Sequence, residues 1–264
     1  MSQTKPKWRL TPSLLNKYQE LMDAELLWDK FYGSSDEPSI TLADYEAKCE
    51  QELIDACNRV EFKSEAASRG TCLNELVDCI IEHRKQREDM LVERVYDNPD
   101  NGTLVALRTD LDGFCFVFDI NFVRSLADYY KDAICQYRCE ATIDTSFGPV
   151  ILYGDADYIR RDVVYDLKST ARYSEYGKFD KGWQKHLYPW ALVKSGEVQS
   201  VSGFEYTVAL LKGKPVISGE IYKEWSDFHF EDSENKLREI TESLVQWIEN
   251  HRNQITHRRI FNKE

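Results

Sequence analysis

Hydrophobic residues follow a helical spacing near both ends of the chain and a strand-like spacing in its middle. The helical pattern predicts helices that begin at Thr11, run from Thr41 to Val60, begin near Gly70 and continue through Ile81, and cover 121–134, 181–194 and 232–254. The strand-like pattern predicts strands over 103–107, 114–118, 137–143, 150–159, 163–168, 201–211 and 215–222. This order indicates an α/β or α+β fold, with a mixed central sheet flanked by helices.

The chain shows no internal repeat, low-complexity stretch or linker that would divide it. Its 264 residues are enough for one large domain, or for one domain with a helical appendage. We therefore expect a single domain over residues 1–264, with an N-terminal helical region over 1–68 and a core over 69–264.

Two acidic residues and a lysine near the ends of two successive predicted strands are the main candidates for chemistry. Asp166 and Lys168 are two residues apart on a strand, so they face the same side, while Leu167 faces the core. Asp157 lies near the end of the preceding strand, where its side chain could converge with Asp166 on a cation. Carboxylates hold hard divalent cations, and a nearby lysine can stabilise negative charge that develops on a phosphate.

An Asp-x-Lys sequence on a strand also occurs as an ordinary surface pair. Here the strand is otherwise apolar over Val163-Val164-Tyr165, which is typical of a buried central strand. Charged residues on a buried strand need a partner or a function, so the pattern favours a functional site.

Several short motifs occur in order along the chain. They are Leu10-Thr11-Pro12-Ser13-Leu14-Leu15-Asn16-Lys17-Tyr18, Arg69-Gly70-Thr71-Cys72-Leu73-Asn74-Glu75, Glu140, Gly154-x-x-Asp157, Asp166-x-Lys168 and Gln184-x-x-x-Tyr188. This ordered set resembles the PD-(D/E)XK nuclease superfamily, and within it the RecB-type exonuclease branch. The resemblance covers the chain from about Leu10 to the last helix, and it implies a restriction-endonuclease-like core.

The resemblance also implies roles for individual residues. Asp157, Asp166 and Leu167 would provide metal ligands, and Lys168 would be the catalytic lysine. Glu140 would be a ligand or reach the metal through water. Gln184 and Tyr188, four apart on one helical face, would contact the active site or the DNA; packing of that face on the sheet is the alternative.

One position departs from the family pattern. Asn74 stands where the family has a helical histidine that binds the metal. An asparagine carbonyl oxygen would suit magnesium better than a nitrogen ligand would, so Asn74 remains a candidate ligand. His186 lies between Gln184 and Tyr188, and we interpret it as a packing or surface histidine.

The net charge of −12 argues against a wide basic surface that coats nucleic acid. It is compatible with DNA binding at a small site, for which Arg160, Arg161, Lys178 and Lys181 are candidates because they flank the catalytic strands and the Gln184 helix. Each of these basic residues could equally be a solvated turn residue.

Composition also bears on cellular location. No apolar run approaches the roughly 18 residues of a membrane span, and the N-terminal segment lacks the apolar part of a signal peptide. Seven cysteines without a C-x-x-C pair favour reduced thiols, and the usual spacings of a zinc or iron–sulfur site are missing. We expect a cytoplasmic protein of a bacterial or phage-infected cell, with no membrane contact.

The sequence therefore predicts a metal-dependent DNA exonuclease that uses Mg²⁺ or Mn²⁺ on linear DNA ends in recombination, repair or phage replication, with a recombination protein as a possible partner. Two alternatives remain open at this point. One is a nuclease-fold protein that has lost efficient catalysis and serves as a nucleic-acid-binding or scaffold module. The other is an RNA-directed or structure-specific nuclease.

Overall fold

A computed structural model of the chain describes residues 5–35, 37–98, 100, 102–174 and 176–262. The helices are α1 (Pro12–Met22), α2 (Ala24–Tyr32), α3 (Leu42–Cys57), α4 (Glu65–Ile81), α5 (Ile120–Tyr129), α6 (Gln184–Lys194) and α7 (Phe230–Asn250), with a final 3₁₀ turn η1 (Arg258–Phe261). The strands are β1 (Trp8–Leu10), β2 (Leu91–Tyr96), β3 (Leu104–Leu111), β4 (Phe114–Asp119), β5 (Ile134–Thr145), β6 (Gly148–Arg160), β7 (Val163–Thr170), β8 (Gly203–Lys212) and β9 (Val216–Asp227). Within these residues, no helix is both long and apolar enough to cross a membrane.

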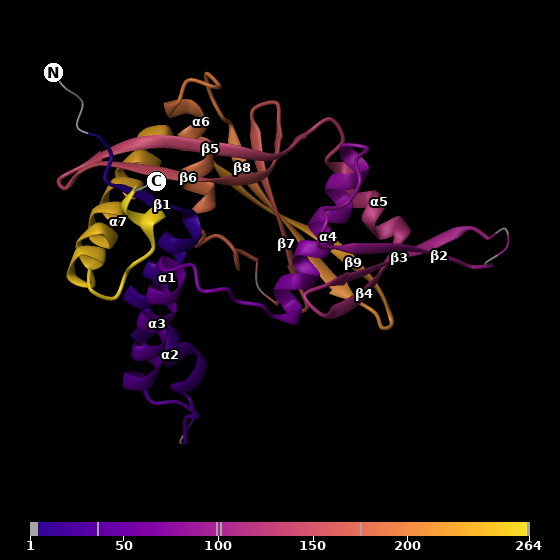
Figure 1. Cartoon of the computed structure of the whole chain (residues 1–264), viewed down its shortest axis with the longest axis horizontal. Helices are drawn as coiled ribbons and strands as arrows, with labels where there is room; N and C mark the ends of the chain where they lie inside the picture. Colours follow the sequence, from indigo (N-terminus) through magenta and orange to yellow (C-terminus); the bar gives the residue numbers. More distant parts are fainter. Residues whose placement is uncertain (1–4, 36, 99, 101, 175, 263–264) are drawn as a thin grey trace.

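The strands form one mixed nine-stranded sheet, which confirms the α/β class expected from the sequence. The strand order is β1-β6-β7-β8-β9-β4-β3-β2, and β5 pairs with β6 as well. β1 with β6, β7 with β8, and β4 with β9 are parallel, whereas the other neighbours are antiparallel. The β4–β9 contact is short, and Figure 1 shows β2, β3 and β4 as an arm at one end of the molecule.

Helices cover both faces of this sheet. One hydrophobic cluster joins α1, α3, α6 and α7 to β5, β6 and β8, and Trp190 and Phe204 are among its fully buried side chains. A second cluster joins α4 and α5 to β3, β4 and the Leu167 face of β7. The two faces of β7 therefore meet different cores, as the alternation of side chains along a strand requires.

Several element boundaries differ from the sequence prediction. α4 begins at Glu65 because the Ser64 side chain caps it. The predicted division between an N-terminal helical region (1–68) and a core (69–264) therefore falls inside a helix. α5 ends at Tyr129 rather than at 134, because Ile134 already pairs with Ile159 in β5. The predicted helix starting at 181 begins at Gln184, and the one predicted over 232–254 covers Phe230–Asn250.

Only part of the N-terminal segment forms an appendage, because β1 and α1 belong to the body of the protein. β1 is part of the sheet, and Leu15 and Tyr18 of α1 are buried in the first hydrophobic cluster. α2 and α3 lie farther out, beside α1, and Figure 1 shows them projecting from the body of the protein. β1, α2 and β2 were not predicted from the sequence.

Candidate functional site

The candidate site lies at an opening in the sheet beside β6. One edge of β6 pairs with β5 from Gly148 to Ile159. The other edge pairs with β1 over Val150 to Leu152 and with β7 only over Tyr158 to Arg160. Between these two contacts the edge of β6 carries no strand partner, because β7 turns away from β6 to pair with β8. Asp157 lies where β6 and β7 separate.

The Asp157 carboxylate bridges the separated strands. Its Oδ2 atom accepts a hydrogen bond from the Leu167 main-chain N–H at 2.8 Å and another from the Asn74 side chain at 3.4 Å. Burial raises the pKa of Asp157, and the nearby charge of Asp166 raises it further. A bound cation would offset both effects, so this carboxylate is suited to ionise when a cation is present.

Asp166 and Lys168 face the same side of β7, as predicted. Asp166 is 4% exposed, and its Oδ2 atom lies 2.7 Å from Lys168 Nζ. Burial alone would lower the pKa of Lys168, but the attraction of Asp166 and Asp157 leaves that pKa raised. Lys168 is therefore a positive charge beside the buried Asp166 carboxylate and near the partly buried Asp157 carboxylate.

Several oxygen atoms near Asp157 and Asp166 are suitable ligands for a hard cation. The Oδ1 atom of Asn74 is buried and has no hydrogen-bond partner within the described residues. The amide nitrogen of the same Asn74 side chain contacts Asp157, so Oδ1 lies close to that carboxylate. A buried acceptor without a hydrogen-bond partner destabilises the folded protein unless a ligand binds it. With Asp166 and the Leu167 carbonyl, these atoms could hold Mg²⁺ or Mn²⁺.

The candidate ligand atoms named above are all oxygen atoms from carboxylate, amide and main-chain groups. Within the part of the chain that the structure describes, His, Cys, Asp and Glu side chains form no group of three or more that could hold a metal. A cation here would accordingly depend on two carboxylates complemented by amide and main-chain oxygens, with water completing its shell. None of the seven cysteines, all within the described residues, forms a disulfide.

Gly154 and Gly70, which belong to two of the sequence motifs, allow close packing around the carboxylates. A Cβ atom at Gly154 would lie 2.7 Å from Cε1 of Tyr188, so only glycine lets α6 approach β6 this closely. Tyr188 is buried, and burial raises its pKa, with smaller contributions from Asp166 and Asp157. Gly70 similarly brings α4 against Ser169 of β7, where a Cβ would lie 3.0 Å from the Ser169 hydroxyl.

Gln184 lies at the start of α6 and lines the same cavity as Lys168. Its Oε1 atom accepts from the Asn16 side chain of α1 and from the Tyr206 hydroxyl, both at 3.4 Å. Asn16 also accepts from the Trp183 main-chain N–H at 2.9 Å, so α1 holds the beginning of α6. Gln184 and Tyr188 thus lie near the candidate site, and Tyr188 also serves the packing role that was the alternative.

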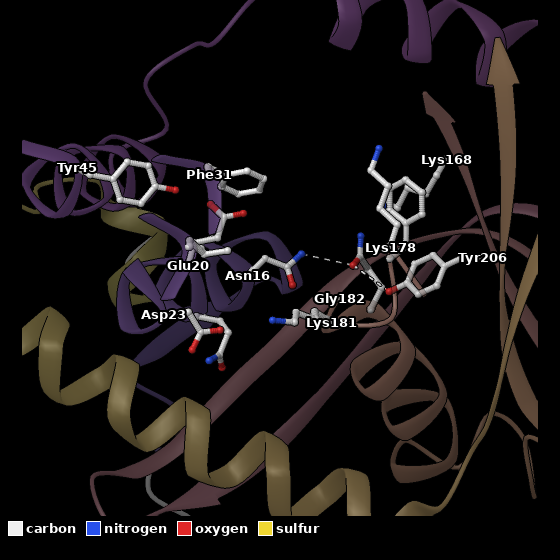
Figure 2. A pocket seen from close by; sticks show the side chains of 14 residues that line it. Asn16, Glu20, Asp23, Phe31, Tyr45, Lys168, Lys178, Lys181, Gly182 and Tyr206 are labelled. Atoms are coloured by element: carbon white, nitrogen blue, oxygen red, sulfur yellow. Dashed lines mark hydrogen bonds between the residues drawn. The ribbon is translucent and has the colours of Figure 1, made fainter. Parts of the chain in front are cut away.

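Two cavities flank the candidate residues. The first, of about 500 Å³, is lined by Lys168, Gln184 and Tyr206 and by α1, α2 and α3, and Lys178 and Lys181 also line it. Figure 2 shows these lysines with Tyr206 on one side and the α1–α3 side chains on the other. The second cavity, of about 470 Å³, is lined by Asn74 and Asp157.

The second cavity contains charged residues that the sequence analysis did not single out. Asp78 lies one helical turn after Asn74 and is 2% exposed, and burial raises its pKa to about 6. It accepts a hydrogen bond from Gln136 at 3.1 Å, and Arg84 lies 3.8 Å away. The four-residue spacing from Asn74 was the only signal in the sequence that could have indicated Asp78.

Glu140 is not brought to this site, which corrects its predicted role as a ligand. On β5 it pairs with Tyr153, four residues before Asp157 and roughly 13 Å away along the strand. Its carboxylate accepts from the Arg9 guanidinium at 2.7 Å. The position of Glu140 was inferred from motif order, whereas the register of β5 decides where its side chain lies.

The two arginines predicted to bind DNA are also placed elsewhere. Arg160 donates to the Tyr129 main-chain oxygen at 2.6 Å and to the Tyr165 hydroxyl at 3.4 Å, so it links α5 to the sheet. Arg161 is exposed in the β6–β7 turn with φ +58°. Arg160 forms the last pair of the hairpin with Val163 and Arg161 lies in the turn, whereas Lys178 and Lys181 line the Lys168 cavity.

His186 packs between two helices, as predicted. Its Nδ1 atom lies 3.0 Å from the Ser233 hydroxyl of α7, and its ring packs near Trp183. Burial lowers the pKa of His186 to about 4, so the ring is neutral at pH 7.

Comparisons with known proteins add little to this geometry. The sequence matches no protein-family model, and it matches no curated protein. A solved structure described as SSO0001 aligns with 93% of this chain and 79% of its own chain, with a TM-score of 0.37 and 11% sequence identity. That similarity is too low to support an argument about fold or function.

Proposed function

We propose that this protein is a metal-dependent nuclease that hydrolyses phosphodiester bonds in DNA. The observation that supports this most directly is the arrangement of Asp157, Asp166 and Lys168 where β6 and β7 separate. The buried Asp166 carboxylate, the partly buried Asp157 carboxylate and an ammonium share one site, and that site adjoins a cavity lined by further lysines. Such a combination can hold a cation and a phosphate side by side.

Each residue has a specific part in this proposal. Asp157 and Asp166 would hold Mg²⁺ or Mn²⁺ together with Asn74 and the Leu167 carbonyl. When bound, the cation would lower the pKa of a coordinated water and screen the charge of the phosphate. The Leu167 N–H fixes the orientation of the Asp157 carboxylate, and Lys168 would orient the attacking water or stabilise negative charge that develops on the phosphate.

The finer features of the proposal come from the resemblance to PD-(D/E)XK nucleases of the RecB type. These are a restriction-endonuclease-like core, action as an exonuclease on linear ends, and a place in recombination, repair or phage replication in the cytoplasm. A recombination protein is a proposed partner, because the acidic surface would hold DNA only weakly by itself.

Labelled linear and covalently closed DNA, incubated with the purified protein and Mg²⁺, Mn²⁺ or chelator, would test this function. We expect cleavage with either metal, none with chelator, and far slower cleavage of circles. Asp166→Ala should lower the rate by orders of magnitude. Asp155→Ala is the matched control, because Asp155 lies on the neighbouring strand β6, two residues from Asp157, and its exposed side chain pairs with Arg138.

The outcomes separate the alternatives. Cleavage that survives Asp166→Ala would show that the site lies elsewhere. Equal rates on circles and linear molecules would leave an endonuclease with the same chemistry. Metal-independent DNA binding without any cleavage of DNA or RNA would favour the scaffold alternative.

A further inference from the structure

The cavity beside Lys168 has two walls of different chemistry. One wall carries Lys168, Lys178 and Lys181, on β7 and the segment that leads to α6. The other wall comes from α1, α2 and α3 and carries polar, acidic and aromatic side chains, namely Asn16, Gln19, Glu20, Asp23, Leu27, Phe31 and Tyr45. Figure 2 shows Phe31 and Tyr45 on the side away from Lys178 and Tyr206.

The lysine wall is suited to phosphate groups. Lys178 donates to the Thr170 hydroxyl at 3.0 Å and to the Arg172 main-chain oxygen at 2.9 Å, which holds its charge near the cavity. Lys181 is exposed, and Lys168 belongs to the candidate site itself. A strand bound along this wall would lead directly to Asp166.

The helical wall is poorly suited to phosphate groups. Glu20 is paired with Lys17 at 2.9 Å, but Asp23 adds a negative charge, and Gln19 and Asn16 are neutral. A DNA duplex presents phosphates on both of its sides, so one strand of a duplex would face this wall. A single strand can turn its phosphates to the lysines and its bases to the helices.

Aromatic side chains on the helical wall provide surfaces for those bases. Phe31 is 62% exposed although it lines the cavity, and an exposed phenylalanine at such a position is available for stacking. Tyr45 lines the same wall, and its ring centroid lies 5.8 Å from that of Tyr32. Carboxylate and amide groups nearby can accept or donate hydrogen bonds at base edges.

We propose that this cavity binds single-stranded DNA, with phosphates on Lys168, Lys178 and Lys181 and a base stacked on Phe31. The inference rests on the proposed nuclease function, and it specifies the substrate as an unpaired strand rather than a duplex. α1, α2 and α3 then form one side of the substrate site.

Binding can be measured separately from cleavage. A short fluorescein-labelled single strand and the matching duplex are titrated with the full-length protein in chelator, and fluorescence anisotropy gives both dissociation constants. We expect tighter binding of the single strand. Phe31→Ala should weaken it about tenfold, which is typical of the loss of one base–aromatic stack, whereas Phe31→Trp should preserve it.

Two further variants make the test specific. Lys181→Ala should weaken binding of all single-stranded sequences and reduce the salt slope by about 0.7, as expected for one lost phosphate contact. Tyr96→Ala is the control, because Tyr96 is an exposed aromatic on β2 in the distant arm, outside the residues that line the cavity. The thermal midpoints of these variants should remain near that of the native protein.

The inference is overturned if the duplex binds as tightly as the single strand, or if Phe31→Ala leaves the dissociation constant unchanged. Metal-dependent cleavage of duplex DNA alone would remove the single-strand proposal and keep the nuclease. A Phe31-dependent preference for single strands, without cleavage under any metal condition, would keep the binding site and remove the nuclease.

Discussion

Replacing Asp157 by asparagine should stabilise the metal-free protein increasingly as the pH rises. Burial and the charge of Asp166 raise the pKa of Asp157 in the folded state. The folded protein therefore retains a proton that the unfolded chain has already lost above its ordinary pKa of about 3.9. Where the folded state binds more protons, stability falls with rising pH, so Asp157 destabilises the protein progressively above about pH 4.

The size of this effect follows from the pH interval. One pH unit between the unfolded and folded pKa values corresponds to about 1.4 kcal/mol, so the interval from about pH 5 to about pH 7 gives up to ~2.7 kcal/mol. Asparagine has no charge to desolvate, and its carbonyl oxygen can still accept from the Leu167 N–H, which now donates at 2.8 Å. The stability difference between Asp157→Asn and the native protein should therefore grow by up to that amount.

Urea unfolding in chelator at the two pH values, for both proteins, measures this difference. Comparing the two proteins at each pH cancels the contributions of titrating groups that do not interact with Asp157, such as His186. Asp155→Asn on the same strand is the control, and its stability difference should not depend on pH in this way. A difference for Asp157→Asn that stays constant with pH would refute the reasoning.

Adding Mg²⁺ provides a second readout of the same variant. A cation that binds only the folded protein stabilises it by mass action, and this stabilisation should be largely lost in Asp157→Asn. Equal stabilisation of both proteins by Mg²⁺ would place Asp157 outside the cation site, whatever its effect on the metal-free protein.

Three other substitutions test neighbouring parts of the site. Lys168→Ala should lower single-turnover cleavage strongly while calorimetric Mg²⁺ affinity stays equal or increases, because a positive charge is removed; normal turnover would contradict the proposed role. Asn74→His should shift calorimetric affinity toward Mn²⁺ over Mg²⁺, and an unchanged preference would place Asn74 outside the ligand set. Gly154→Ala should cost about 1–3 kcal/mol in urea unfolding through contact with Tyr188, and Tyr188→Leu should relieve part of that cost; additive effects of the two changes would exclude the contact.

Local sequence patterns were sufficient for most of the fold. The apolar run Val163-Val164-Tyr165 predicted the buried strand β7, and the helical repeat near the C-terminus predicted α7, because each pattern directly encodes what is buried. The start of α4 was misplaced because Gly70 resembles a helix breaker. The tertiary structure keeps Gly70 inside the helix, where its lack of a side chain lets α4 approach Ser169.

Very short or exposed elements could not be predicted in this way. β1 has three residues, and its conformation depends on pairing with β6, which lies about 140 residues later in the chain. α2 exposes Leu26 and Phe31, so its burial pattern does not show the single apolar face typical of a packed helix.

Sequence alone was also sufficient to place Asp166 and Lys168 on one face of a strand, because that relation depends only on a spacing of two. It could not decide that Asp157 binds the Leu167 N–H, since this contact needs the open edge of β6. Nor could it show that Glu140 pairs with Arg9.

The tertiary structure alone decided which distant segments form the cavity beside Lys168. Asn16 and Gln184 are 168 positions apart, yet their side chains meet at 3.4 Å where α1 holds the beginning of α6. Hydrophobic periodicity records which face of an element is buried, but many arrangements of elements satisfy the same periodicity. Packing of α1 on the sheet, together with the shared core of α6 and α7, selects the arrangement that brings Phe31 and Lys168 to one cavity.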